Sequence, residues 1–181
     1  MNPFVEIENV TLSYSDELRE PAVQDLSISI EEGEFSAVVG PSGCGKSTVL
    51  TMLAGLNEIS DGGIIVGTKE IDGPGPDRAV VFQAPCLMPW MNAFQNVMLG
   101  VKNVYPHISK LERKQIVEYS LSVIGLGDAM KKYPREMSGG MQQRVGLARA
   151  LATGAECLLM DEPFSALDPL IRRQLQTEFI K

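Results

Sequence analysis

The chain has 181 residues, which corresponds to about one domain, because domains average about 150 residues. Hydrophobic residues make up 44% and charged residues 22%, as in globular proteins, and this excludes a disordered chain or a fibrous repeat. The formal net charge of −7 argues against a sequence-independent nucleic-acid binder, which needs clustered Lys and Arg side chains.

The termini and the cysteines predict a cytoplasmic protein. No apolar run approaches the ~18 residues of a membrane-spanning helix. Residues 1–6 do not place a basic segment before an apolar one, so they do not predict a signal peptide. Cys44, Cys86 and Cys157 are too few and too far apart for a disulfide framework or a zinc site. We therefore expect a soluble, reduced, cytoplasmic α/β domain.

Five segments predict strands of two kinds. Apolar and polar residues alternate around Val5 and Ile7 and again over residues 26–30, which predicts half-buried strands. Three later runs are continuously apolar, as strands covered on both faces of a parallel sheet are; they are residues 35–39, 79–82 and 157–160. Each of these runs is followed at once by polar or Gly-rich residues, where α/β sheets place their ligands.

The stretch between the second and third of these runs predicts helices. Ser109 and Glu112 have the spacing of a capping box, and apolar residues follow at near-helical spacing up to Gly125. We expect residues 92 to about 150 to form a mostly helical insertion on a mixed sheet. Residues 72–77 contain so much Gly and Pro that they predict a connecting loop.

Residues 40–48 match the phosphate-binding P-loop pattern, G-x-x-x-x-G-K-[ST]. Glycines let successive N–H groups point inward, and the following helix adds its positive end. Lys46 would neutralise the β and γ phosphates, and the Ser47 hydroxyl can ligate Mg²⁺. A chance Gly-rich turn is the alternative, but the apolar runs on both sides favour nucleotide binding. The candidate nucleotide-binding residues here are Gly40, Pro41, Ser42, Gly43, Cys44, Gly45, Lys46, Ser47 and Thr48.

Two adjacent carboxylates, Asp161 and Glu162, follow the last apolar run. Like charges side by side are unfavourable in a partly buried place unless a cation relieves them. A Mg²⁺ ion held by Ser47 and Asp161 would do so, which leaves Glu162 to orient or deprotonate an attacking water. An exposed acidic turn before Pro163 is the alternative for the pair alone, and the P-loop makes the metal site the better hypothesis.

Residues 137–144, Met-Ser-Gly-Gly-Met-Gln-Gln-Arg, resemble the signature segment of ABC-type ATPases, usually written LSGGQ. With the P-loop and the carboxylate pair this identifies the chain as a member of that family over nearly its whole length. The other family motifs are present in order: Tyr14 as the adenine-stacking aromatic, Gln83 as the Q-loop, and residues 165–168 as the D-loop.

The resemblance implies an α/β fold of the P-loop NTPase class, with a RecA-like core, an antiparallel β subdomain and a helical subdomain at about residues 92–150. It implies one ABC ATPase domain over residues 1–181, incomplete at its C-terminus. It further implies ATP and Mg²⁺ as cofactors, with Glu162, Gln83 and Lys46 as catalytic residues. The implied metal ligands are Ser47, Gln83 and Asp161.

The same resemblance implies a two-fold dimer of ATPase subunits. Ser138 can cap a helix, and Gly139 and Gly140 leave its positive end accessible to an anion. In the family, these residues and the next one, Met141 here, face the γ-phosphate on the partner's P-loop. By itself, this pattern is better explained by an ordinary capped helix.

The sequence departs from the family pattern in two places. Met141 replaces the usual Gln of the signature. The family's switch His follows the D-loop on a strand that this sequence, ending at Lys181, does not include. The one histidine, His107, precedes the signature and cannot replace it. We expect the chain as written to hydrolyse ATP poorly.

Residues 75–90 resemble importer ATPases of the nitrate, sulfonate and taurine branch, and residues 106–113 look most like its nitrate, cyanate and bicarbonate members. This implies permease subunits and a substrate-binding protein as partners, no nucleic acid, and a place on the inner face of the cell membrane. Trp90 is a candidate contact for a permease helix or a residue packed inside its own domain. Two alternatives stay open, a soluble ABC protein acting on ribosomes or DNA and a catalytically weak ATP-binding fragment.

Overall fold

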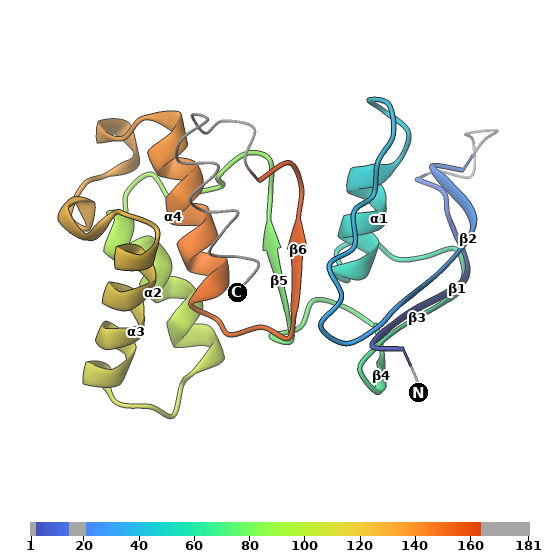
Figure 1. Ribbon diagram of the computed structural model, residues 1–181, viewed down its shortest axis with the longest axis horizontal. Coiled ribbons are helices and arrows are strands. Elements are labelled where there is room, and N and C mark those ends of the chain that lie inside the picture. The colour runs from blue at the N-terminus through green and yellow to red at the C-terminus, as the bar shows by residue number, and fades with distance from the viewer. Residues whose placement is uncertain (1–2, 15–20, 164–181) are drawn as a thin grey trace. The chain divides into compact units, whose positions relative to one another are not determined.

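The protein is seen in a computed structural model that describes residues 3–14 and 21–163 (Figure 1). The chain divides into two units, Met1–Gly75 and Pro76–Lys181, called unit 1 and unit 2. Each unit has its own sheet, and the described residues include one helix in unit 1 and three α-helices in unit 2. None of the helices in the described ranges is long and apolar enough to cross a membrane.

Unit 1 contains a four-stranded antiparallel sheet in the order β2-β1-β3-β4. Its strands are β1 (Val5–Leu12), β2 (Val23–Ile30), β3 (Asp61–Val66) and β4 (Lys69–Glu70). The predicted strands around Val5 and Ile7 and over residues 26–30 are confirmed. Helix α1 (Lys46–Leu53) supplies buried Val49, Met52 and Leu53 to the core of the same unit.

A bulge in β1 shows how the sequence keeps its apolar side chains on one face. Val5 and Ile7 are buried, and the next buried residue is Val10, one position out of phase. Asn9 lies between them with a φ of 49°, and its side chain donates to the Asp25 carboxylate at 2.8 Å. The extra residue restores the inward orientation of the strand's second half.

The strand predicted over residues 35–39 is wrong for this structure. These residues form no regular element, and Phe35 and Val39 are 76% and 90% exposed. A strand exists only where a neighbour satisfies its backbone N–H and C=O groups. The sheet of unit 1 consists of β1 to β4, and residues 35–39 pair with none of them. Apolar composition alone therefore did not determine the local structure.

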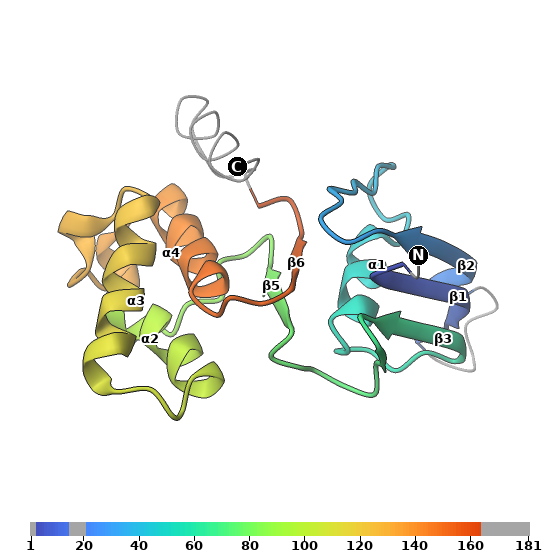
Figure 2. The ribbon, with the colours of Figure 1, turned by 60° about the horizontal axis from the view of Figure 1, so that its bottom comes forward.

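Unit 2 pairs β5 (Arg78–Val81) with β6 (Cys157–Met160) in parallel, which confirms the two other buried strands. Three helices pack together in this unit, α2 (Ala93–Val104), α3 (Lys110–Val123) and α4 (Gly139–Leu151), as Figure 2 shows. Two short 3₁₀ turns, Gly127–Ala129 and Pro134–Glu136, connect α3 to α4. The largest fully buried apolar side chains of this layer are Leu121, Leu147, Val97, Val101, Val117 and Val145.

Two capping boxes fix the starts of α2 and α3. The predicted box is present: the Ser109 hydroxyl accepts from the Glu112 N–H, and the Ser109 N–H donates back to the Glu112 carboxylate at 2.8 Å. Hydrogen bonds from the Ser109 side chain and from the Ser109 backbone to the Glu112 carboxylate lower the pKa of this group. Asn92 and Gln95 form a second box at the start of α2, which the sequence analysis did not predict.

Asn96 is fully buried on α2 and holds the chain that leads into this helix. Its side-chain oxygen accepts from the Met88 N–H at 2.8 Å, and its amide nitrogen donates to the Met91 carbonyl at 2.9 Å. Buried backbone groups that lose such partners carry the full cost of leaving water.

We expect Asn96→Ala to lower the free energy of unfolding by about 1–3 kcal/mol, because backbone groups at Met88 and Met91 lose their partner. Thermal or urea denaturation would measure the change. The matched control is Gln95→Ala one residue earlier, which removes an exposed capping contact and should cost less than about 1 kcal/mol. Equal losses in the two variants would contradict this role for Asn96.

Candidate functional site

The P-loop, residues 40–48, leads into the first turn of α1 in unit 1, and the start of this helix has no side-chain cap. Gly45 is the N-cap residue with a φ of 94°, and the first turn contains no acidic residue. A Cβ at Gly45 would lie 2.9 Å from the Ala22 carbonyl oxygen, so only glycine fits both the space and the backbone angle. The positive end of α1 is thus arranged to accept an anion from outside the chain.

Lys46 folds back over this loop. Its Nζ donates to the carbonyl oxygens of Gly40 at 3.0 Å and Pro41 at 2.7 Å. An ammonium group has three donors and no acceptor, so it can bridge several oxygens at once. A phosphate oxygen entering the loop would meet the same donors, which is the property that a phosphate cradle needs.

Tyr14 lies beside the same helix. Its hydroxyl is 3.2 Å from the Thr48 Oγ1 and accepts from the Asn57 side-chain amide at 3.2 Å. Asn57 also donates to the Thr51 hydroxyl at 2.9 Å, which ties the tyrosine to α1. The ring is 60% exposed and can stack on a flat ligand. Asn57 was missed from the sequence, since a single Asn after a helix gives no motif.

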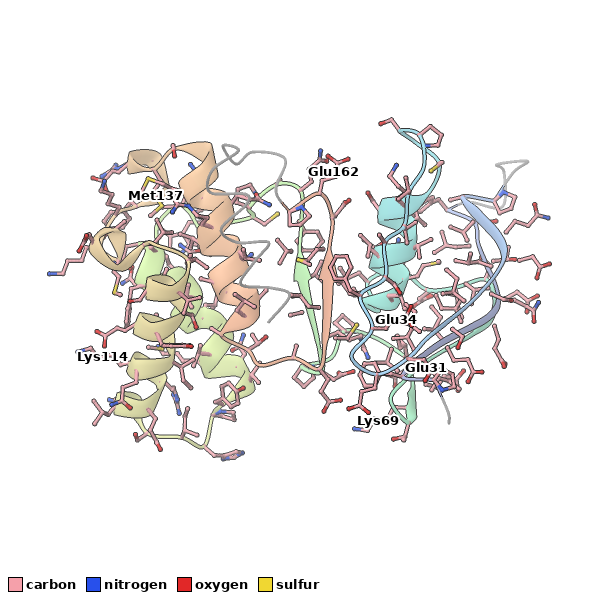
Figure 3. The ribbon with its side chains drawn as sticks, viewed as in Figure 1. Glu31, Glu34, Lys69, Lys114, Met137 and Glu162 are labelled. Carbon is pink, nitrogen blue, oxygen red and sulfur yellow. The ribbon has the colours of Figure 1, made fainter. Side chains whose placement is uncertain are left out.

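The carboxyl ends of β5 and β6 form the second part of the candidate site, in unit 2. The Asp161 N–H donates to the Val81 carbonyl at 2.9 Å, which extends the ladder past the end of both strands. The Gln83 side-chain amide then donates to the Glu162 carboxylate at 3.2 Å. Figure 3 shows Glu162 at the end of β6. Two residues that lie 79 positions apart in the sequence are thus in contact.

Glu162 has a φ of 43°, in the left-handed region that glycine favours. A non-glycine residue held there costs on the order of 1–3 kcal/mol, and such strain concentrates at functional sites. The sequence does not predict this angle, because a glutamate followed by Pro163 gives no signal for it.

The signature residues lie at the start of α4 in unit 2. The Ser138 hydroxyl caps the helix by accepting from the Met141 N–H at 3.3 Å, as predicted. A Cβ at Gly139 would meet nothing within 4 Å, so this helix start is open. Met137 is buried in the helical core and anchors the segment (Figure 3).

The predicted site residues are divided between the two units. Tyr14 and residues 40–48 lie in unit 1, whereas Gln83, Asp161, Glu162 and residues 138–141 lie in unit 2. A site that draws on both units stays a prediction. The D-loop, residues 165–168, lies outside the described residues.

Comparison with known proteins agrees with the motifs. A family model described as "ABC transporter" matches residues 23–165. A bicarbonate transport ATP-binding protein of Synechococcus elongatus is 46% identical over 181 residues, which cover 99% of this chain and 65% of that protein. A nitrate transport protein of Klebsiella oxytoca is 47% identical over 178 residues, 97% of this chain and 68% of that protein. The chain therefore spans about two thirds of the length of these relatives.

The same fold is found among solved structures. A dimeric structure of an ATP-binding cassette, described as a post-hydrolysis state bound to ADP and Pi, superimposes with a TM-score of 0.88. Its sequence is 31% identical, and the match covers 97% of this chain and 81% of that one. The P-loop NTPase fold of ABC cassettes, predicted from the motifs, is thus confirmed.

The left-handed backbone at Glu162 generates a stability prediction. We expect Glu162→Gly to be more stable than Glu162→Ala by about 1 kcal/mol, because only the alanine keeps a strained Cβ. At Glu156, which does not have a positive φ, the order should reverse, since glycine costs more entropy on folding than alanine. Urea denaturation of the four variants would test this. The same order at both positions would contradict the strain at Glu162.

Proposed function

The chain belongs to the ABC transporter family, and from this membership we propose that it is the ATP-binding and ATP-hydrolysing subunit of an importer for nitrate or a similar small anion. The observation that carries the proposal is the intact P-loop on the uncapped start of α1, with Lys46 donating into the loop. The printed names of the relatives support an anion such as nitrate or bicarbonate.

The residues of unit 1 suit the nucleotide. Lys46 exchanges its contacts with the Gly40 and Pro41 carbonyls for phosphate oxygens, and the N–H groups at the start of α1 surround the same oxygens. Tyr14 stacks on the adenine, positioned by its contact with Thr48. Catalysis of phosphoryl transfer consists mostly of positioning and charge neutralisation, which this loop supplies without covalent chemistry.

Mg²⁺ fits the donor atoms that the family motifs supply. Ser47, Gln83 and Asp161 offer hydroxyl, amide and carboxylate oxygens, the atom type that Mg²⁺ prefers, and they would hold the ion. When bound, Mg²⁺ neutralises charge on the phosphates. Glu162 accepts a proton from the attacking water, and Gln83, which donates to it at 3.2 Å, keeps its carboxylate in place.

The partners follow from the open start of α4. A second ATPase subunit, identical or paralogous, places the γ-phosphate of its ATP against Ser138, Gly139, Gly140 and Met141, so that two sites are shared across a two-fold axis. The described cassette relative is dimeric, which supports this arrangement. Residues 92–150 act as the helical subdomain of a single ATPase domain.

The permease contact lies near Trp90. This side chain is 69% exposed, which favours a partner helix over packing inside its own domain. Binding there would hold the subunit on the cytoplasmic face of the membrane, with permease subunits in the membrane and a substrate-binding protein beyond it.

We expect Lys46→Ala to weaken Mg-ATP binding at least about 10-fold, since it removes charge-assisted hydrogen bonds to the phosphates. Isothermal titration would measure the dissociation constant. The matched control is Lys69→Ala, an exposed lysine on β4 of the same unit, which should bind ATP as the wild type does. Unchanged affinity in Lys46→Ala would overturn the P-loop assignment.

In a chain extended through the segment that carries the family's switch His, we expect Glu162→Gln to lower ATP hydrolysis by about 10²–10⁴-fold, because it removes the proton acceptor and keeps the side-chain shape. The bound ATP should then persist and favour the dimer, which light scattering at saturating Mg-ATP would detect. Glu156→Gln, which changes an exposed glutamate before β6, is the control. A Glu162→Gln protein that stays monomeric would count against the shared site.

A further inference from the structure

One side of α4 holds the loop that follows β5, residues 82–86. The Gln143 side-chain amide donates to the Phe82 carbonyl at 3.1 Å. One turn later, the absence of a side chain at Gly146 lets the loop approach, since a Cβ there would lie 3.4 Å from the Pro85 carbonyl oxygen. Residues three apart on a helix lie on the same side, so these contacts form one surface.

Arg149 completes this surface another turn along. Its two terminal nitrogens donate to the carbonyls of Cys86 at 3.0 Å and Pro85 at 3.3 Å. Burial lowers the pKa of the Arg149 guanidinium. The two carbonyl oxygens, in place of a carboxylate, offset part of the cost of removing this charge from water. Gln143, Gly146 and Arg149 thus all contact the loop that follows β5.

The held loop carries Gln83, whose side chain meets Glu162 at 3.2 Å. Gln143 binds the carbonyl of the residue directly before Gln83. The position of the Gln83 backbone, and with it the direction of its side chain, therefore depends on α4. Ser138 caps the same helix, and Gln143 lies four residues, about one turn, after its first residue, Gly139, so both contacts belong to one helix.

A glutamine at position 143 lowers the stability of the fold unless the hydrogen bond that its amide donates is needed. It is 1% exposed, and its Oε1 has no hydrogen-bond partner. A buried acceptor without a partner costs free energy, and an apolar side chain of the same length would avoid this cost. The contact to Phe82 is what the glutamine supplies in return.

We propose that Gln143 is a positioning residue that holds Gln83 against Glu162 and couples the start of α4 to this pair. This inference rests on the proposed function, in which Glu162 activates water beside ATP. It adds a residue that acts on the reaction through Gln83, without touching substrate.

The first test follows the Gln83 side-chain amide directly. In protein labelled with ¹⁵N-glutamine, this signal is assigned by its loss in Gln83→Ala and should shift in Glu162→Gln. We expect Gln143→Met, which keeps the length of the side chain and removes both polar atoms, to move the Gln83 signal as Glu162→Gln does. The matched control is Gln142→Met, since Gln142 donates to the Pro134 carbonyl at 2.9 Å, away from the loop.

The second test uses the rate of hydrolysis. Gln143→Met should lower kcat by about 10–100-fold and leave the Kd for ATP in unit 1 within about two-fold, since only positioning is lost. In a Gln83→Ala background, Gln143→Met should have no further effect, because residues that act through one another are not additive.

Two outcomes would overturn the inference: an unchanged Gln83 signal in Gln143→Met, or full additivity with Gln83→Ala. A wild-type protein that neither binds nor hydrolyses ATP would instead overturn the proposed function. In that case the Gln83 signal still decides whether Gln143 holds the contact with Glu162.

Discussion

The parallel pairing of β5 with β6 determines where the chemistry of unit 2 can lie. Its register places Val81 opposite Met160, and the hydrogen bond from Asp161 to Val81 continues the ladder beyond the strands. Parallel strands deliver the residues that follow them to the same edge of a sheet. Gln83 and Glu162 meet because each lies two residues past the end of its strand. A slip of one residue in this pairing would separate them.

The starts of α1 and α4 are the second structural feature on which the candidate site depends. α1 begins at a glycine without a side-chain cap, whereas α4 begins at Ser138, whose hydroxyl caps the helix and still leaves the surroundings of Gly139 open. Both helices therefore present their positive ends without an acidic residue in the first turn. α1 belongs to unit 1 and α4 to unit 2, so each unit contains one of these two helix starts.

Local patterns in the sequence predicted most of the strands, the start of α3 and the P-loop. Alternation identified β1 and β2, the spacing of Ser109 and Glu112 identified the start of α3, and the Gly-rich motif identified the loop before α1. These signals are local, so they survive without knowledge of the rest of the fold. The strand predicted over residues 35–39 failed because a strand needs a neighbouring strand to pair with, and apolar composition does not indicate whether one is present.

The contacts that the sequence did not predict join distant segments. The bond from Gln143 to Phe82 spans 61 positions, and that from Arg149 to Cys86 spans 63. No periodicity reports such pairs, since a Gln or Arg on a helix usually predicts an exposed side chain. They become visible only when α4 is seen packed against β5.

Backbone strain in the described residues follows the same contrast between local contacts and contacts that join distant segments. Four non-glycine residues there have positive φ angles: Asn9, Asp25, Cys86 and Glu162. Asn and Asp tolerate this region, and Asn9 and Asp25 bond each other at the bulge between β1 and β2, so their angles serve the fold. Cys and Glu have no such tolerance. Cys86 ends the loop that Arg149 holds, and Glu162 accepts from Gln83 in the same loop. The strain that local chemistry does not relieve thus lies on either side of Gln83, where α4 and the ladder of β5 and β6 hold the backbone in place.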